Sequence, residues 1–97
     1  GIYPDEQAPG YRHFYISPQM PEGLTWANTS RETPYGTVQV NWKVDDATVL
    51  LDIVIPAGSK ATVILPENGT GYTLDGKETK ENKLIISSGT YSVSWRQ

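Results

Sequence analysis

The 97-residue sequence contains no cysteine and a single histidine, and these scarcities remove several common kinds of site. Without cysteine the chain can form neither a disulfide framework nor a thiolate metal site, and one histidine argues against the usual zinc arrangements. No apolar run approaches the roughly 18 residues of a membrane-spanning helix. A net charge of −3 leaves no basic footprint for nucleic acid. No glycine-rich phosphate loop is present either. We therefore expect no metal, cofactor, nucleic acid or membrane partner.

Helical periodicity is also missing from the chain. Seven prolines and nine glycines interrupt the sequence every few residues, which favours many short strands. At 97 residues the chain should form one domain with a single thin core and no deep catalytic cleft.

The clearest strand signal lies between residues 37 and 55. Val38, Val40, Trp42 and Val44 alternate with polar residues, and Thr48–Ile55 follows after a turn at Asp45-Asp46. Asp75-Gly76 marks a second hairpin turn. Further strands are predicted at residues 11–16, 24–32, 60–65, 72–74, 84–87 and 90–95. About eight short strands predict an all-β, antiparallel β-sandwich of jelly-roll or Greek-key type.

The first ten residues hold two prolines and show no alternation. We interpret residues 1–10 as an extended linker and residues 11–97 as the sandwich domain. The sequence starts Gly1-Ile2-Tyr3 without an initiator methionine or signal peptide, which suggests a piece of a longer protein.

Candidate catalytic groups are few, and each has an ordinary explanation. Glycosidases need two carboxylates facing each other across a bond, whereas Asp45 and Asp46 lie in a predicted turn. Asp52 is interpreted as a solvated strand residue, with burial against a partner as the alternative. His13 has no predicted nucleophile or Gly-x-Ser-x-Gly elbow with which to form a triad. We assign no catalytic residue.

The aromatic residues allow two interpretations. Trp42 and Trp95 are in phase with core valines, whereas the position of Trp26 is ambiguous. Exposed rings could form a stacking platform for sugars or an interdomain contact. Tyr72 is one candidate surface ring. The candidate interdomain or sugar contacts are Tyr11, His13, Tyr15, Trp26 and Tyr35.

Four apolar residues fall on strand faces that should be wet in a sandwich: Leu50, Val54, Ile64 and Ile85. Scattered exposed apolar residues are ordinary. The alternative is that the outer face of one sheet rests on another domain.

Three stretches resemble the C-terminal β-sandwich domain of bacterial α-L-rhamnosidases, glycoside hydrolase family 78. Together they cover nearly the whole chain, in the order of the family. Their segments are residues 1–5, 8–14 and 16–19, then 23–27, 33–36 and 40–43, and finally 53–57, 61–63, 65–66 and 88–91.

The resemblance implies a non-catalytic accessory domain. In that family the catalytic carboxylates belong to an upstream (α/α)₆ barrel, so no residue here inherits a catalytic role. The expected partner is the upstream catalytic domain of the same polypeptide, which this domain would pack on and stabilise. The parent would release terminal α-L-rhamnose from plant or microbial glycans with inversion. A carbohydrate-binding module for rhamnose-containing glycans, and an independent adhesion or scaffold sandwich, are the alternatives.

Overall fold

A computed structural model describes residues 2–4, 12–18, 23, 25–67 and 69–97. All regular elements in these ranges are strands, and no helix able to cross a membrane occurs among them. The strands are β1 (Ile2–Pro4), β2 (His13–Ile16), β3 (Trp26–Thr33), β4 (Gly36–Asp45), β5 (Thr48–Ile55), β6 (Lys60–Ile64), β7 (Thr70–Leu74), β8 (Lys77–Glu78), β9 (Lys83–Ile86) and β10 (Gly89–Arg96).

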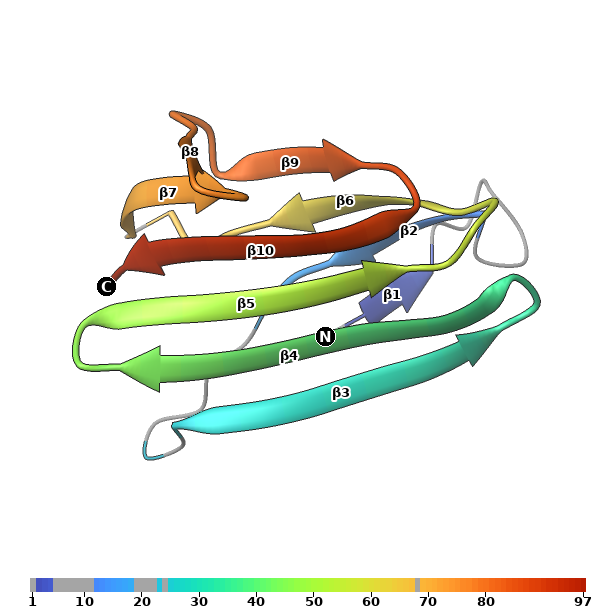
Figure 1. The fold of residues 1–97 in the computed structure, drawn as a ribbon, viewed down its shortest axis with the longest axis horizontal. Coiled ribbons are helices and arrows are strands. Elements are labelled where there is room, and N and C mark those ends of the chain that lie inside the picture. The colour runs from blue at the N-terminus through green and yellow to red at the C-terminus, as the bar shows by residue number, and fades with distance from the viewer. Residues whose placement is uncertain (1, 5–11, 19–22, 24, 68) are drawn as a thin grey trace.

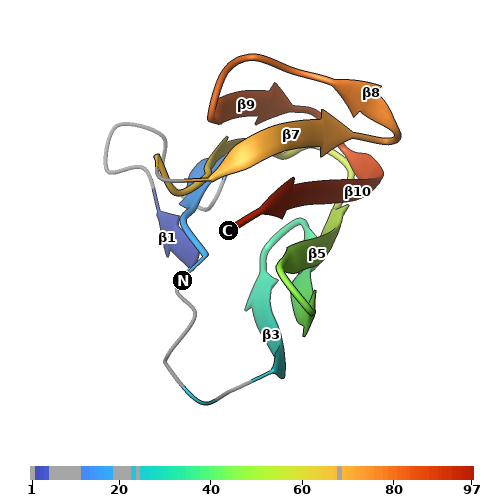
Figure 2. The ribbon, with the colours of Figure 1, turned by 90° about the vertical axis from the view of Figure 1, so that its left-hand side faces the viewer.

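The strands form two sheets that pack face to face, and the predicted β-sandwich is confirmed. One sheet has four strands in the order β1-β2-β6-β9, and the other has six in the order β3-β4-β5-β10-β7-β8. Figure 1 shows β3, β4, β5 and β10 side by side with β1, β2 and β6 behind them. In the turned view, β1 lies on one side of the sandwich and β3 and β5 on the other (Figure 2).

The core lies between the sheets and is supplied by alternate residues of both. The predicted inward rows of β4 and β5 are confirmed, since Val38, Val40 and Trp42 are buried, as are Val49, Leu51, Ile53 and Ile55. Trp95 is also buried, as its phase predicts. The four-stranded sheet contributes Ile2, Phe14, Ile16, Ala61, Val63, Leu84 and Ile86.

Two hairpin turns use a backbone conformation that few residues tolerate. Asp75 and Gly76 have φ of 50° and 84°, the two positive values of a type I′ turn, and join β7 to β8. Asp46, with φ of 55°, joins β4 to β5. Asp tolerates this region because its short polar side chain can bond locally.

The structure differs from the sequence-based expectation in several places. Ile2–Pro4, placed in a linker, pairs with β2 and so belongs to the four-stranded sheet, while residues 5–10 lie outside the described ranges. The β2–β6 pair is parallel in an otherwise antiparallel sandwich. The prediction that Tyr72 is a surface ring was wrong. Its ring is buried as part of the hydrophobic core, and its hydroxyl donates a hydrogen bond to the Pro66 carbonyl.

Candidate functional site

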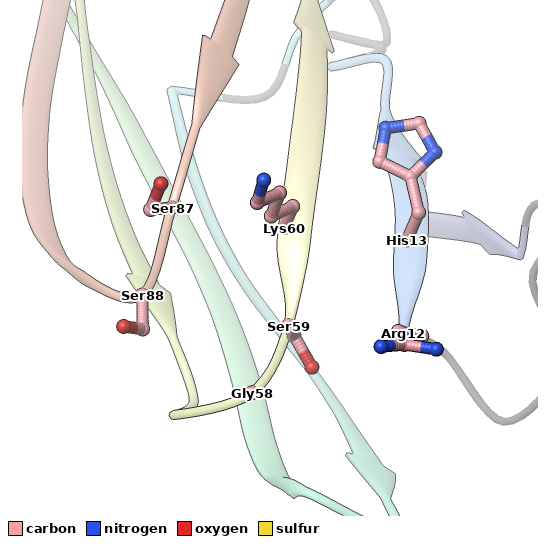
Figure 3. Close-up of a pocket in the computed structure, with 7 residues that line it drawn as sticks. All are labelled: Arg12, His13, Gly58, Ser59, Lys60, Ser87 and Ser88. Carbon is pink, nitrogen blue, oxygen red and sulfur yellow. The ribbon is translucent and has the colours of Figure 1, made fainter.

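A pocket of about 490 Å³ opens at one end of the sandwich, where β2 and β6 begin and β9 ends. Figure 3 shows the residues that line it, which come from three separate chain segments. They are Arg12, His13, Gly58, Ser59, Lys60, Ser87 and Ser88.

Backbone hydrogen bonds hold the floor of this pocket in place. The Lys60 N–H donates to the Arg12 carbonyl at 2.9 Å, which joins the starts of β6 and β2. The Ser59 N–H donates to the Pro56 carbonyl at 3.2 Å and closes the β5–β6 turn. Gly58 has φ of 88°, and a Cβ there would lie 2.9 Å from the Tyr35 ring. The turn therefore requires glycine, both for its backbone and for its space.

The charged side chains around the pocket are cationic. Arg12 and Lys60 line it, and no carboxylate does so among the described residues. The remaining polar groups are the serine hydroxyls and the His13 ring, which can hydrogen-bond but form no pair of acids. The pocket can thus receive a carboxylate or a hydroxylated ligand, but its described residues do not include the carboxylate pair that glycoside hydrolysis needs.

The candidate residues His13 and Tyr15 lie together on the outer face of β2. Their ring centroids are 5.1 Å apart in an edge-to-face arrangement. His13 Nε2 also lies 2.9 Å from Thr62 Oγ1, within hydrogen-bond distance. Thr62 is buried although it points outward, so its neighbours on this face shield it from water. Tyr11 lies outside the described residues.

Tyr35 lies in the β3–β4 turn at the same end of the molecule as the pocket. Its ring faces Gly58, one of the pocket residues, and remains 41% exposed. The Thr33 Oγ1 accepts a hydrogen bond from the Tyr35 N–H at 3.1 Å and donates one to the Gly36 carbonyl at 2.8 Å, which fixes the turn.

Trp26 is separated from the other candidates, because it lies on the outer face of the six-stranded sheet. It starts the edge strand β3 and is 64% exposed. A shallow hollow of about 240 Å³ runs from Trp26 across the sheet, past Asn28, Asn41, Lys43, Leu50 and Asp52. Asp52 is exposed, as interpreted, and accepts a hydrogen bond from the Ser92 hydroxyl at 3.1 Å.

Sequence reasoning did not select Tyr3, Arg12 or Lys60 as candidate site residues. Tyr3 was missed because a three-residue strand shows no alternation, yet it is 46% exposed on the outer face of β1. Arg12 and Lys60 are 48 positions apart in sequence, and only the parallel β2–β6 pairing brings them together. One signal was available, because Leu50, Val54, Ile64 and Ile85 break the alternation of their strands, and all of these except the half-buried Val54 are exposed.

Comparison with known proteins identifies the family. The profile of the bacterial alpha-L-rhamnosidase C-terminal domain matches residues 1–80. Two alpha-L-rhamnosidases of Formosa agariphila are similar to this chain. One is 24% identical over 100% of the chain and 12% of its own length, and the other is 28% identical over 84% and 10%.

A solved structure shares the fold. The alpha-L-rhamnosidase of Dictyoglumus thermophilum superposes with a TM-score of 0.82 at 21% identity, covering 100% of this chain and 12% of that protein. The present chain therefore spans about a tenth of the length of the relatives it matches. With its two-sheet sandwich and a match over most of its residues, the chain belongs to the bacterial α-L-rhamnosidase C-terminal domain family.

Proposed function

We propose that this chain is a non-catalytic accessory domain, which packs on the upstream catalytic part of an α-L-rhamnosidase and stabilises it. The observation that carries the proposal is apolar surface on the outer face of the four-stranded sheet, where Tyr3, Ile64 and Ile85 are all exposed. Apolar side chains on an ordered outer face are favoured where another surface covers them. The match to a C-terminal domain family, over about a tenth of the length of the relatives, supports such a neighbour.

The activity that we propose for the parent protein is hydrolysis of terminal α-L-rhamnosyl linkages with inversion, as its family resemblance implies. The catalytic acid and base would belong to the upstream (α/α)₆ barrel. This division of labour agrees with the cationic pocket, whose described lining residues include no carboxylate.

Deletion of the domain tests this proposal. The full-length polypeptide and a version that ends before Gly1 should both be assayed on an aryl α-L-rhamnoside, and their thermal unfolding compared. We expect the truncated protein to unfold at a lower temperature and to lose activity sooner on heating. The 97-residue chain alone should show no turnover. Turnover by a purified chain, or a truncated protein with unchanged Tm, would contradict the proposal.

A second candidate function is binding of rhamnose-containing glycans through the hollow beside Trp26. Its support is a highly exposed indole next to amide and carboxylate groups of Asn28, Asn41 and Asp52. Sugars stack their C–H faces on such rings while polar side chains bond their hydroxyls. Calorimetry with rhamnose and rhamnogalacturonan should then show saturable binding that Trp26→Ala abolishes and Tyr35→Ala leaves intact. No heat above dilution across these ligands would reject this candidate.

A further inference from the structure

A row of side chains crosses the outer face of the four-stranded sheet, and it is aromatic or apolar on every strand except β6, where the buried Thr62 lies. Ladder pairs place Tyr3 beside Tyr15, Tyr15 beside Thr62, and Thr62 beside Ile85, so that the row crosses all four strands. Tyr3, Ile85 and the nearby Ile64 are exposed. A single exposed apolar residue is ordinary, whereas several on the outer face of one sheet indicate a candidate site of interaction.

The charges on this sheet all have one sign. Its described strands carry Lys60 and Lys83, Arg12 immediately precedes β2, and none of these described residues is Asp or Glu. The chain as a whole is acidic, with 11 Asp and Glu against 8 Lys and Arg. A cationic face on an acidic domain fits a partner that presents carboxylates. We call this surface, formed by Tyr3, Tyr15, Lys60, Ile64, Lys83 and Ile85, the apolar–cationic face.

The centre of this face is already ordered in the isolated domain. His13 Nε2 lies 2.9 Å from Thr62 Oγ1, and the His13 ring packs edge-to-face with the Tyr15 ring. Side chains fixed in this way lose little conformational entropy when a partner covers them. The face is therefore suited to a stable, rigid contact.

The position of β1 indicates which partner would reach this face. β1 is the edge strand of the four-stranded sheet, and Tyr3 on β1 belongs to the apolar–cationic face. The relatives are roughly tenfold longer, and the matched family is a C-terminal domain, so the rest of such a polypeptide would join the domain through β1. A partner tethered there has a high effective concentration, and a modest patch is then enough for docking.

We infer that the apolar–cationic face is the surface through which this domain docks onto the upstream part of its own polypeptide. The inference rests on the proposed accessory function and deepens it. The complementary upstream surface would place apolar side chains against Tyr3 and Ile85 and carboxylates against Lys60 and Lys83. The outer face of the six-stranded sheet would remain in solvent.

Two matched substitutions, each of which introduces a carboxylate into the full-length polypeptide, test this inference. Ile85→Glu places a carboxylate within the proposed contact, and Leu50→Glu places one on the outer face of the other sheet, at a residue that is 44% exposed. Limited proteolysis before β1 reports docking, because an undocked domain exposes its connection. We expect Ile85→Glu to raise the cleavage rate at least about tenfold, since a buried, unpaired carboxylate is strongly unfavourable. Leu50→Glu should leave the rate unchanged.

A second pair of variants covers the case in which Ile85→Glu disturbs folding. The isolated chain carrying Ile85→Glu should unfold at the same temperature as the unmodified chain, because the side chain is exposed there. If it does not, Lys60→Glu is compared with Lys43→Glu, since both lysines are exposed strand residues on opposite outer faces. Only Lys60→Glu should accelerate cleavage.

The outcomes separate the inference from the proposed function. If deleting the domain lowers the Tm of the parent while Ile85→Glu and Lys60→Glu have no effect, the accessory function stands and the assignment of this face is overturned. An effect of Leu50→Glu or Lys43→Glu alone would overturn it in favour of the six-stranded sheet. If deletion itself changes nothing, the proposed function fails and this inference fails with it.

Discussion

The two outer faces of the sandwich are built on the same strand alternation but carry different side chains. On the six-stranded sheet, exposed Leu50 pairs with the polar residues Lys43 and Ser94, and Asp52 follows two residues along its own strand. On the four-stranded sheet, Ile85 lies in a row with tyrosines and among lysines. Exposure of one large apolar residue therefore distinguishes little by itself. The composition around it separates a solvated face from one suited to a partner.

The largest loss of stability is expected from a substitution in the core, on which both sheets pack. Phe14 is fully buried on the inner side of β2. Phe14→Ala should lower the unfolding free energy by about 3–5 kcal/mol, through lost burial and a residual cavity. Urea denaturation of the isolated chain measures this loss, with Tyr15→Ala on the outer side of the same strand as the control. Equal losses for both variants would contradict the assignment of inner and outer sides.

A smaller loss is expected at the turn that supports the pocket end of the four-stranded sheet. Gly58 has φ of 88° and lies against the Tyr35 ring, whereas Gly71, with φ of 65°, has open space where a Cβ would go. Gly58→Ala adds a steric clash to backbone strain of about 1–3 kcal/mol, and Gly71→Ala adds the strain alone. Thermal unfolding should rank Gly58→Ala as the less stable. Equal losses would show that the Tyr35 ring moves aside freely, and the reverse order would contradict the role of the clash.

Removing one hydrogen bond on each outer face compares the two faces through the stability lost, which we expect to be about 1 kcal/mol or less. Thr62 is buried beside His13, whereas the Ser92–Asp52 pair on the other face is exposed. Thr62→Val should cost about 1 kcal/mol, because the hydrogen bond between Thr62 Oγ1 and His13 Nε2 is lost in a shielded position. Ser92→Ala should stay within about 0.5 kcal/mol, as exposed substitutions usually do. Chemical denaturation of both variants measures the difference, and equal values would argue that the four-stranded face is as wet as the other.

The smallest effect is expected from exposed apolar residues in the isolated chain. Ile85→Ser and Leu50→Ser should each change the unfolding free energy by no more than about 0.5 kcal/mol. Calorimetry of the two variants checks this. A large loss of unfolding free energy for Ile85→Ser would mean that Ile85 stabilises the domain itself, which would contradict its role as a residue exposed for contact with a partner.

The sequence predicted those parts of the fold that depend on local pattern. Thr48–Ile55 was predicted with the bounds that β5 has, because Val49, Leu51, Ile53 and Ile55 recur at every second position between two turn signals. β1 and β8, with three and two residues, are too short to alternate and exist through pairing with β2 and β7. The parallel β2–β6 pair joins residues 47 positions apart, which no local pattern reveals.

The candidate site residues could likewise be predicted only where the signal is local in sequence. The broken alternation at Leu50, Val54, Ile64 and Ile85 indicated apolar residues on outer faces, because that signal is local, but these residues belong to both sheets and the pattern did not indicate which sheet faces a partner. Grouping Trp26 with His13 and Tyr15 required knowledge of which sheet each strand joins, and the structure places Trp26 on the other sheet. Tyr72 was misplaced because its burial in the core depends on how β7 packs in the sandwich, which the local sequence does not reveal.

Thiol labelling tests the central claim most directly, because the chain has no cysteine of its own. Ile85→Cys and Leu50→Cys are made singly in the isolated chain and in the full-length polypeptide, and alkylation at each position is followed by peptide mass spectrometry. We predict that the thiol at position 85 reacts at least about tenfold more slowly in the full-length protein than in the isolated chain, while the thiol at position 50 reacts equally in both. Equal rates at position 85 in the two proteins would contradict the account.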